Sequence, residues 1–121
     1  MPLTRVALYR ESDGSVPFLD WFDELAPKAQ DKCRVKIERL RELGFELRRP
    51  EVDFLRDGIY ELRVGLHHVN YRTLYFFHGR QLAVISHGIT KERAVPAIEI
   101  DRAIRRRANF ARDPRGHTHE E

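Results

Sequence analysis

The amino-acid sequence predicts an α+β fold in which helices cover a mainly antiparallel sheet. Three observations predict it: a strand pattern at residues 3–10, two helical patterns after it, and three strand patterns between Gly58 and Arg93 followed by a last helical pattern. A sheet of this kind leaves one face available for function. The 121 residues suffice for a single domain, which we assign to residues 1–112, with a flexible tail at 113–121.

The first half of the chain supplies the strand and two helices. The segment LTRVALYR predicts a strand, and SDGS predicts a turn. Phe18, Phe22 and Leu25 recur at helical spacing and predict a short helix. Pro27 opens a longer helix that Gly44 ends. Its apolar stripe is Cys33, Ile37 and Leu40, and FELRRPEVDFLRDG after it predicts a connecting loop.

Turn parity decides which side chains of the three consecutive strands share a face. We expect two-residue turns at Leu66–His67 and at Gly79–Arg80; a three-residue loop at the second turn flips the parity and breaks up the polar cluster. The apolar face is then Tyr60, Leu62, Val64, Val69, Tyr71, Tyr75, Phe77, Leu82 and Val84. The opposite face gathers Glu61, Arg63, Asn70, Arg72 and His87.

That polar face has two interpretations. It is a solvated surface on which Glu61 and Arg72 form an ordinary cross-strand pair, or it is a basic binding site with a titratable imidazole. His67 and His68 fall in the turn, without carboxylate or cysteine partners at ligand spacing, so we expect exposed loop residues rather than metal ligands.

The C-terminal part of the chain is strongly basic. Pro96 starts a helix whose predicted core stripe is Ala97, Ile100, Ile104 and Ala108, while Arg102, Arg105 and Arg106 are expected to point elsewhere. The net charge is +3 and the pI about 9.3. Residues 91–115 hold eight basic and four acidic residues, which favours a polyanionic partner, either nucleic acid or an acidic protein segment.

The sequence also favours a cytoplasmic protein without a membrane segment. It has one cysteine, no apolar signal-peptide core and no apolar run of about 18 residues.

The segments LRDGIYELRV, NYRTLYFFHGRQLAVISHGITKER and EIDRAIRR, in this order, resemble the phage-derived branch of the RelE/HigB-type toxins of bacterial type II toxin–antitoxin systems. The resemblance spans nearly the whole chain. It implies a small RelE-like fold with a curved sheet, two N-terminal helices packed on one face and a C-terminal helix. It also implies a ribosome-dependent endoribonuclease that cleaves mRNA without a metal or other cofactor.

The partners that the resemblance implies are mRNA on the ribosome and a cognate antitoxin, often a helix-turn-helix protein. Assembly as a homodimer or as a toxin–antitoxin hetero-oligomer stays open. By matching position, Arg63 and Arg72 fall where such toxins place phosphate-contacting arginines, and Lys91 and Arg93 fall where a basic residue follows the last strand.

The chemistry of metal-free RNA cleavage suits these residue types. The 2′-hydroxyl attacks the adjacent phosphate, so an enzyme must orient it, neutralise the developing charge and transfer protons. We expect Arg72, His87 and Lys91 to be catalytic: Arg72 as charge stabiliser, His87 for proton exchange, more as a base than as an acid, and Lys91 as phosphate contact or proton donor. Arg63, Asn70, Arg93, Arg102 and Arg106 are the expected substrate-binding residues.

The chain departs from the family pattern at one point. Many RelE-type enzymes use a tyrosine near the C-terminus, whereas the last tyrosine here is Tyr75. An inactive or differently specialised homologue is therefore an alternative, as is a non-enzymatic module that binds RNA or an acidic peptide through the same basic face.

Overall fold

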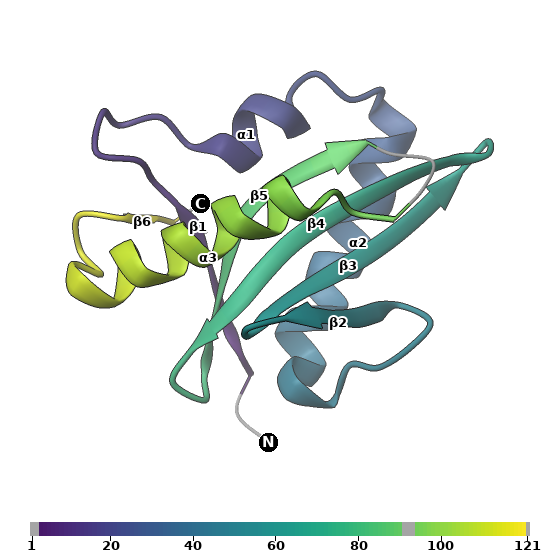
Figure 1. The fold of residues 1–121 in the computed structure, drawn as a ribbon. Coiled ribbons are helices and arrows are strands. Elements are labelled where there is room, and N and C mark those ends of the chain that lie inside the picture. The colour runs from purple at the N-terminus through teal and green to yellow at the C-terminus, as the bar shows by residue number, and fades with distance from the viewer. Residues whose placement is uncertain (1–2, 91–93, 121) are drawn as a thin grey trace.

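The computed structural model describes residues 3–90 and 94–120 and contains one mixed sheet (Figure 1). The strand order is β2-β3-β4-β5-β1-β6; neighbours are antiparallel except for the parallel pair β1 and β5. The strands are β1 (Arg5–Tyr9), β2 (Val52–Arg56), β3 (Ile59–Leu66), β4 (Val69–His78), β5 (Leu82–Thr90) and β6 (Thr118–His119). The helices are α1 (Pro17–Phe22), α2 (Pro27–Leu43), α3 (Ala97–Arg112) and the short 3-10 helix η1 (Gly44–Glu46).

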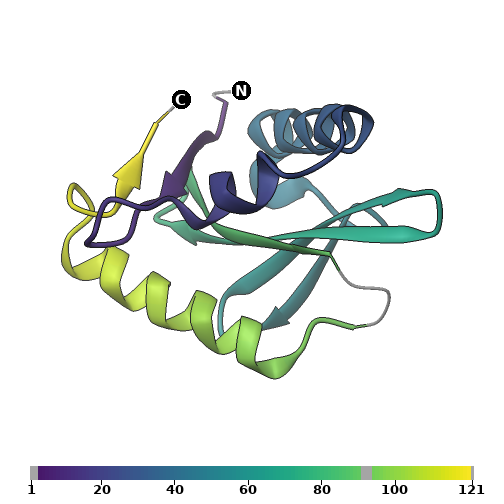
Figure 2. The same ribbon diagram turned by 90° about the horizontal axis from the view of Figure 1, so that it is seen from above.

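Helices lie on both sides of the sheet. Figure 2 shows α1 and α2 on one side and α3 crossing the other. This confirms the α+β fold with two N-terminal helices on one face and a C-terminal helix. The expectation that the second face is open is wrong, because a second core of apolar residues, Ile59, Leu74, Phe76 and Phe110 among them, lies there between the sheet and α3.

The core under α1 and α2 follows the predicted helical stripes. Phe18 and Phe22 of α1 are buried, as are Cys33 and Leu40 of α2. Burial raises the pKa of the Cys33 thiol to about 11, so this thiol is a packing residue that stays protonated near neutral pH. No helix in the two described ranges combines the length and hydropathy needed to cross a bilayer.

The hairpin β3–β4 confirms the predicted parity. Its turn is His67–His68, one position later than expected, and both histidines are exposed with positive φ of 51° and 65°. The register pairs Val64 with Tyr71 and Leu62 with Thr73. Moving the turn by one position changes the pairing register by two residues, so every side chain of β3 and β4 keeps its predicted face.

The hairpin β4–β5 also places His87 on its predicted face, but through two changes of parity that cancel each other. His78 pairs with Leu82, so a three-residue loop joins the strands and flips the parity at the start of β5. Leu82 and Val84 therefore pack toward α3, and their predicted place under α1 and α2 is wrong. Leu74 pairs with His87 and Tyr75 with Ile85, which leaves Ser86 as an extra residue in a β-bulge. The bulge flips the parity back, so His87 shares the Arg72 face as predicted.

Two strands lie where the sequence predicts none. β2 forms in the expected loop after Pro50 and pairs with β3 through Phe54 and Tyr60. β6 forms in the expected flexible tail, where His119 pairs with Leu8 of β1 and the His117 ring stacks on Tyr9 at a centroid distance of 5.0 Å. Both are short edge strands. β2 pairs with β3 directly after it across the turn at Asp57 and Gly58, whereas β6 pairs with β1 from the other end of the chain, which a local pattern does not reveal.

Helix α3 turns a different side to the sheet than predicted. Its buried residues are Ile100, Ala103, Arg106 and Phe110. Ala97 and Ala108 of the expected stripe are exposed. The small error in helical phase matters, because it brings Arg106 into the interior beside the sheet.

Candidate functional site

Two ionic clusters occupy the sheet face that α3 covers. The first, the Glu61 cluster, consists of Asp53, Glu61, Arg63 and Arg72. Arg63 donates from Nε to Glu61 Oε1 at 2.7 Å and from its Nη2 to Asp53 Oδ2 at 2.9 Å. Arg72 donates from Nη1 to both Glu61 oxygens at 3.0 and 2.9 Å. One carboxylate thus holds two guanidinium groups in fixed positions.

Burial distinguishes this cluster from an ordinary surface pair. Glu61 is only 1% exposed, and the Arg72 side chain is 12% exposed, so the interpretation of a solvated cross-strand pair is wrong. The Nε of Arg72 is buried without a hydrogen-bond partner among the described residues. Arg63 keeps a 40% exposed side chain and is the accessible cation of the pair.

The second cluster, the His87 cluster, joins β5 to α3 and consists of Ser86, His87, Glu99, Arg102 and Arg106. The Nε2 of His87 lies 3.1 Å from Glu99 Oε1, and its Nδ1 lies 2.7 Å from Ser86 Oγ and 3.0 Å from Arg106 Nη1. Arg106 can only donate, so the arrangement fits a neutral imidazole that accepts at Nδ1 and donates at Nε2. Both ring nitrogens are therefore engaged.

The surroundings keep the His87 ring neutral. Burial, together with the positive charge of Arg106, lowers the pKa of His87 to about 4, although Glu99 acts in the opposite direction. The sequence predicts this direction from the cationic neighbours, but burial is the larger cause. For Glu99, burial favours the protonated form, yet the hydrogen bond from Arg102 and the contact with His87 hold its pKa below its usual value.

Arg106 ties the cluster to the loop after β1. Its guanidinium is 3.2 Å from Glu11 Oε2 and lies over the Tyr9 ring at 5.9 Å from the centroid. The residue is 8% exposed and lines the cavity beside His87, so its expected role in substrate binding stays a prediction. In the structure it is a buried cation that orders Glu11 and His87.

A cavity of about 440 Å³ opens beside the His87 cluster. Its lining comes from α1, β5 and α3 and includes Trp21, Ile89, His87, Glu99, Arg102 and Arg106. Trp21 is held by a hydrogen bond from its Nε1 to Thr90 Oγ1 at 3.0 Å. Arg102 lies at the rim with a 46% exposed side chain and donates to Glu99 Oε1 at 3.0 Å.

The two clusters share a face but are separate. Across the sheet, Leu74 pairs with Glu61 on one side and with His87 on the other, and Leu74 is fully buried between them. The structure therefore brings Arg63 and Arg72 together and places His87 with Arg102 and Arg106 one strand away. Asn70 lies at the far end of the hairpin, opposite Gly65. The expected sites Lys91 and Arg93 lie outside the described residues.

Sequence reasoning named Glu61 but missed Asp53 beside it and the two acidic residues near His87 and Arg106. Glu99 and Glu11 were not singled out, although Glu99 lies three residues before Arg102, at the spacing of a helical ion pair. Trp21 was missed because α1 has only six residues and shows too little of a pattern. Among the described residues, no group of three or more His, Cys, Asp or Glu side chains is arranged to hold a metal ion.

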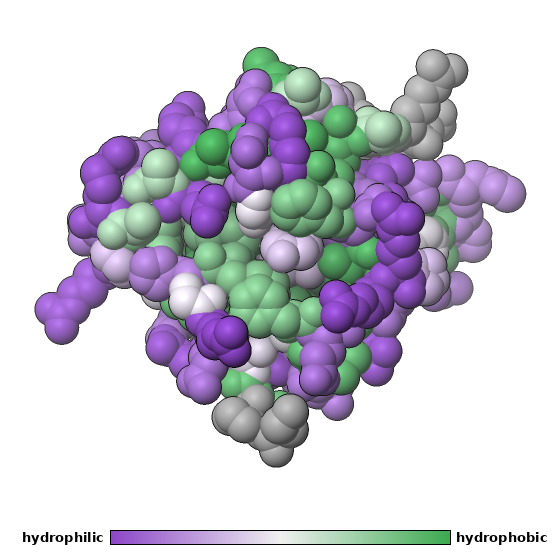
Figure 3. Space-filling model, turned by 60° about the horizontal axis from the view of Figure 1, so that its bottom comes forward, coloured by the Kyte–Doolittle hydropathy of each residue, from purple (hydrophilic) through white to green (hydrophobic). Residues whose placement is uncertain are grey.

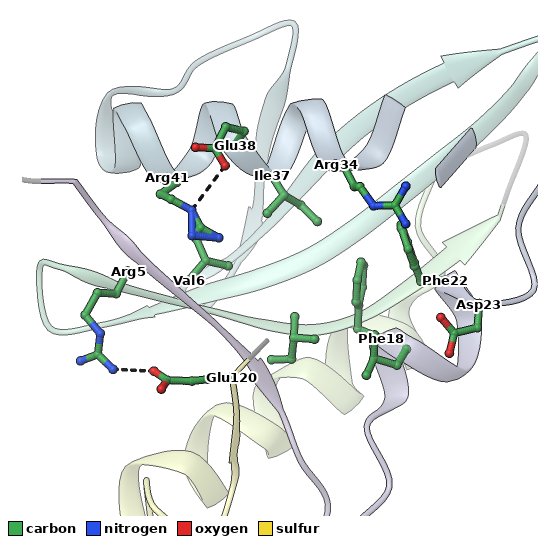
Figure 4. A pocket seen from close by; sticks show the side chains of 12 residues that line it. Arg5, Val6, Phe18, Phe22, Asp23, Arg34, Ile37, Glu38, Arg41 and Glu120 are labelled. Carbon is green, nitrogen blue, oxygen red and sulfur yellow. Dashed lines mark hydrogen bonds and ion pairs between the residues drawn. The ribbon is translucent and has the colours of Figure 1, made fainter. Parts of the chain in front are cut away.

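Two other surface features lie away from these clusters. A cavity of about 710 Å³ between α1, α2 and β1 has an apolar floor that includes Val6, Phe18 and Ile37 (Figure 4). At its rim, Arg5 pairs with Glu120 at 2.7 Å and Arg41 lies 3.5 Å from Glu38. The lining holds three cations and three carboxylates, so it favours neither sign of ligand.

An aromatic surface forms the second feature. In Figure 3, which brings the lower end of Figure 1 forward, hydrophobic side chains gather near the middle of the face inside a ring of hydrophilic ones. Phe45 of η1 and Phe54 of β2 are 46% and 54% exposed, and Phe45 stacks on Phe77 at 3.8 Å between ring centroids.

Comparison with known proteins adds one match. The family model described as Phage derived protein Gp49-like (DUF891) matches residues 20–108, which run from α1 through most of α3 and include every member of the Glu61 and His87 clusters. No curated protein matches the chain.

Proposed function

We propose that this chain, which belongs to the phage-derived Gp49-like family of RelE-like toxins, is the toxin of a type II toxin–antitoxin system. In this proposal it is a ribosome-dependent endoribonuclease that cleaves mRNA through attack of the 2′-hydroxyl on the adjacent phosphate, without a metal. The observation that carries the proposal is the convergence of Glu99, Arg102 and His87 on one open cavity. A carboxylate beside an exposed guanidinium is suited to a hydroxyl next to a phosphate.

In this mechanism Glu99 takes the role of base that the sequence suggested for His87. Its pKa lies below the usual value, so it is ionised near neutral pH, and its side chain is 17% exposed at the cavity. Glu99 accepts the proton of the 2′-hydroxyl at Oε2, because Oε1 already accepts hydrogen bonds from His87 and Arg102. The guanidinium of Arg102 neutralises charge on the phosphate oxygens. His87 is then a positioning residue, because its Nε2 holds Oε1 of the same carboxylate.

The Glu61 cluster supplies a second, more distant set of phosphate contacts. Arg63 is accessible enough to bind a phosphate of the same RNA strand, and Arg72 supports it through their shared carboxylate. Lys91 and Arg93 follow the end of β5 in the sequence: Lys91 stays a proposed phosphate contact or proton donor to the leaving 5′-oxygen, and Arg93 stays a proposed substrate contact. The proposed partners are mRNA on the ribosome and a cognate helix-turn-helix antitoxin, in a hetero-oligomer or beside a toxin homodimer.

One set of observations favours the non-enzymatic alternative. Both nitrogens of His87 are occupied, and Arg63 and Arg72 already pair with acids. The last tyrosine, Tyr75, is 1% exposed, and burial raises its pKa well above the usual range. A module that only binds RNA or an acidic peptide needs none of these groups to exchange a proton.

The experiment that tests the proposal is controlled expression in a bacterial host combined with mapping of mRNA 5′ ends. The informative variant is Arg102→Ala, since Arg102 is exposed and its loss leaves no buried charge unpaired. Its matched control is Arg34→Ala, which also removes an arginine from an exposed i,i+3 pair but on α2. Arg72→Ala is unsuitable, because it removes one of the two arginines that hold the buried Glu61 carboxylate and so alters stability as well as the site.

We expect the unaltered protein and Arg34→Ala to arrest growth and to produce new 5′ ends on ribosome-bound mRNA, and Arg102→Ala to lower both effects by at least about tenfold. Unaltered protein that is harmless and yields no new 5′ ends contradicts the enzyme. RNA binding that persists without cleavage supports the binding module instead. A short neighbouring reading frame for a helix-turn-helix protein supports the toxin–antitoxin pair.

A further inference from the structure

The outer half of β3 pairs with β4 on one side but has no strand on its other side within the described residues. β2 pairs with β3 only from Ile59 to Leu62, and the last contact between these segments is the bond from the Arg63 N–H to the Glu51 carbonyl at 2.8 Å. Figure 1 shows β3 running on beyond the end of β2 toward its turn with β4. This stretch of β3 is therefore an open sheet edge.

The backbone at this edge points outward at Gly65. Leu66 and Val69 flank a two-residue turn, so the backbone N–H and C=O groups of Leu66 point toward β4 and bond to Val69. Successive residues of a strand point these groups to opposite sides, so Arg63 and Gly65 both point theirs away from β4. The outward bond of Arg63 to Glu51 shows which side that is. The N–H and C=O of Gly65 face the same open side, and Gly65 is exposed with no atom within 4 Å of where a Cβ would stand.

A basic cavity of about 430 Å³ lies next to this edge. It is lined by Asp31, Lys32, Val35 and Lys36 of α2 and by Arg63, Val64 and Gly65 of β3. The one carboxylate, Asp31, is already paired with Arg34 at 3.0 Å. Lys32 has no ion-pair partner in the described part of the chain, and Val35 is an exposed apolar contact at 61%. The cavity thus presents an unmatched positive charge and a small apolar surface.

We propose that this edge binds an extended acidic segment of a partner protein, which adds to the sheet as a strand beside Gly65. The N–H and C=O of Gly65 supply the pairing groups that such a strand needs. Side chains of the added strand alternate between the two faces, so they meet Lys32 on the α2 side and Arg63 on the other, and acidic residues suit both. RNA satisfies the charges but leaves the outward backbone groups of Gly65 without a strand partner. The proposal does not depend on ribonuclease activity.

The test uses the full-length protein labelled with ¹⁵N and a capped peptide of about the eight-residue length of β3 in which Glu-Glu and Val-Val pairs alternate, so that both faces of the strand carry Glu. We expect the Gly65 amide signal to shift on titration and its hydrogen exchange to slow by about tenfold or more at saturation. The matched control peptide has Lys in place of each Glu and should leave the signal unchanged. Lys32→Glu should weaken binding of the acidic peptide by about tenfold.

Two further variants separate strand addition from simple charge attraction. Gly65→Pro removes the outward N–H at an edge position where proline is tolerated, and it should abolish protection, whereas Gly65→Ala keeps the donor and should bind normally. Thermal unfolding checks that both variants fold. The proposal is overturned if the acidic peptide leaves Gly65 unaffected, if both peptides bind equally, or if Gly65→Pro binds as well as Gly65→Ala. It is also overturned if only a single-stranded RNA of similar length binds here.

Discussion

Glu61 and Leu62 are neighbours on β3 and equally buried, yet their surroundings have opposite character. Leu62 faces α1 and α2 and packs among aliphatic and aromatic side chains, while Glu61 faces the side of α3 and binds two arginines. One face of the sheet is a conventional apolar core. The other is an apolar core divided by two ionic clusters, in which each charge depends on a specific partner.

The difference shows how the two faces should respond to change. An apolar core loses stability in proportion to the volume and area removed, and neighbouring side chains relax partly into the gap. A buried ionic cluster responds to loss of a partner, because the remaining charge cannot return to water without local unfolding. The ionic face is therefore less tolerant of single substitutions, and it is also the face on which the proposed function depends.

The largest effect expected is for Glu61→Ala. It removes the acceptor that Arg72, 12% exposed, has among the described residues, so we expect a loss of about 3–5 kcal/mol in the free energy of unfolding. Leu62→Ala, one residue away on the other face, should cost about 2–5 kcal/mol through cavity formation. Urea unfolding with a constant m-value measures both.

A double substitution distinguishes the two mechanisms. Glu61→Leu combined with Arg72→Leu removes both charges and keeps most of the volume, so it should recover most of the stability that Glu61→Ala loses. Arg63 retains Asp53 as an acceptor in this variant. If the double variant is as unstable as Glu61→Ala, the loss comes from packing, and the contrast between the two faces fails.

An effect of similar size is expected from pH, on the ionic face alone. The pKa of His87 falls from 6.5 in the unfolded chain to about 4 in the folded protein. As the pH drops below 6.5, the unfolded state binds a proton that the folded state does not, so the free energy of unfolding should fall by about 3 kcal/mol by pH 4. Above pH 6.5 this contribution is constant.

His87→Gln is the control for this prediction, since it should remove the slope between pH 6.5 and pH 4. Further loss at lower pH should persist in the variant, because the hydrogen bonds from Arg39 and Lys36 hold the pKa of Glu51 to about 2. An unchanged slope in His87→Gln would show that His87 does not stay neutral in the folded protein.

A smaller effect is expected on the apolar face at Gly88. A Cβ added there would overlap the indole ring of Trp21, which packs directly against the β5 backbone. Gly88→Ala should therefore cost about 1–3 kcal/mol and shift the tryptophan fluorescence as the ring is displaced. Gly65→Ala, in open space on β3, is the matched control and should change the fluorescence little. Equal effects at the two glycines would contradict the close packing of Trp21.

Much of the fold follows from local pattern. Phe18 and Phe22, the Cys33–Leu40 stripe and the alternation through Leu62 and Val64 were all predicted, because one face of each element is uniformly apolar. β2 and β6 were not: the segment of β2 follows Pro50 and was interpreted as a loop although it pairs with the adjacent β3, and β6 forms only against the distant β1. The error at Leu82 and Val84 arose because loop length is not visible in a segment such as HGRQ.

The candidate site was predictable in Glu61 and in the basic residues of the strands, but not in its other acids. Arg63, Arg72 and His87 stand out as polar residues within strands, so turn parity alone assigned them to one face. Their burial was not foreseen, because it depends on α3 crossing that face, and α3 does so in a phase that brings Arg106 inward. Glu99 and Glu11 are recognised as part of the site only through their contacts with His87 and Arg106, which are distant in sequence.

The paired irregularities of β5 carry an evolutionary consequence. The three-residue loop at residues 79–81 and the extra residue Ser86 each exchange the two faces to which the following side chains of β5 point. Only together do they leave His87 facing α3. A relative that loses one residue from the loop while keeping the bulge would turn this histidine toward α1. We therefore expect insertions and deletions at these two places to occur together in the family, as a compensated pair seven residues or fewer apart.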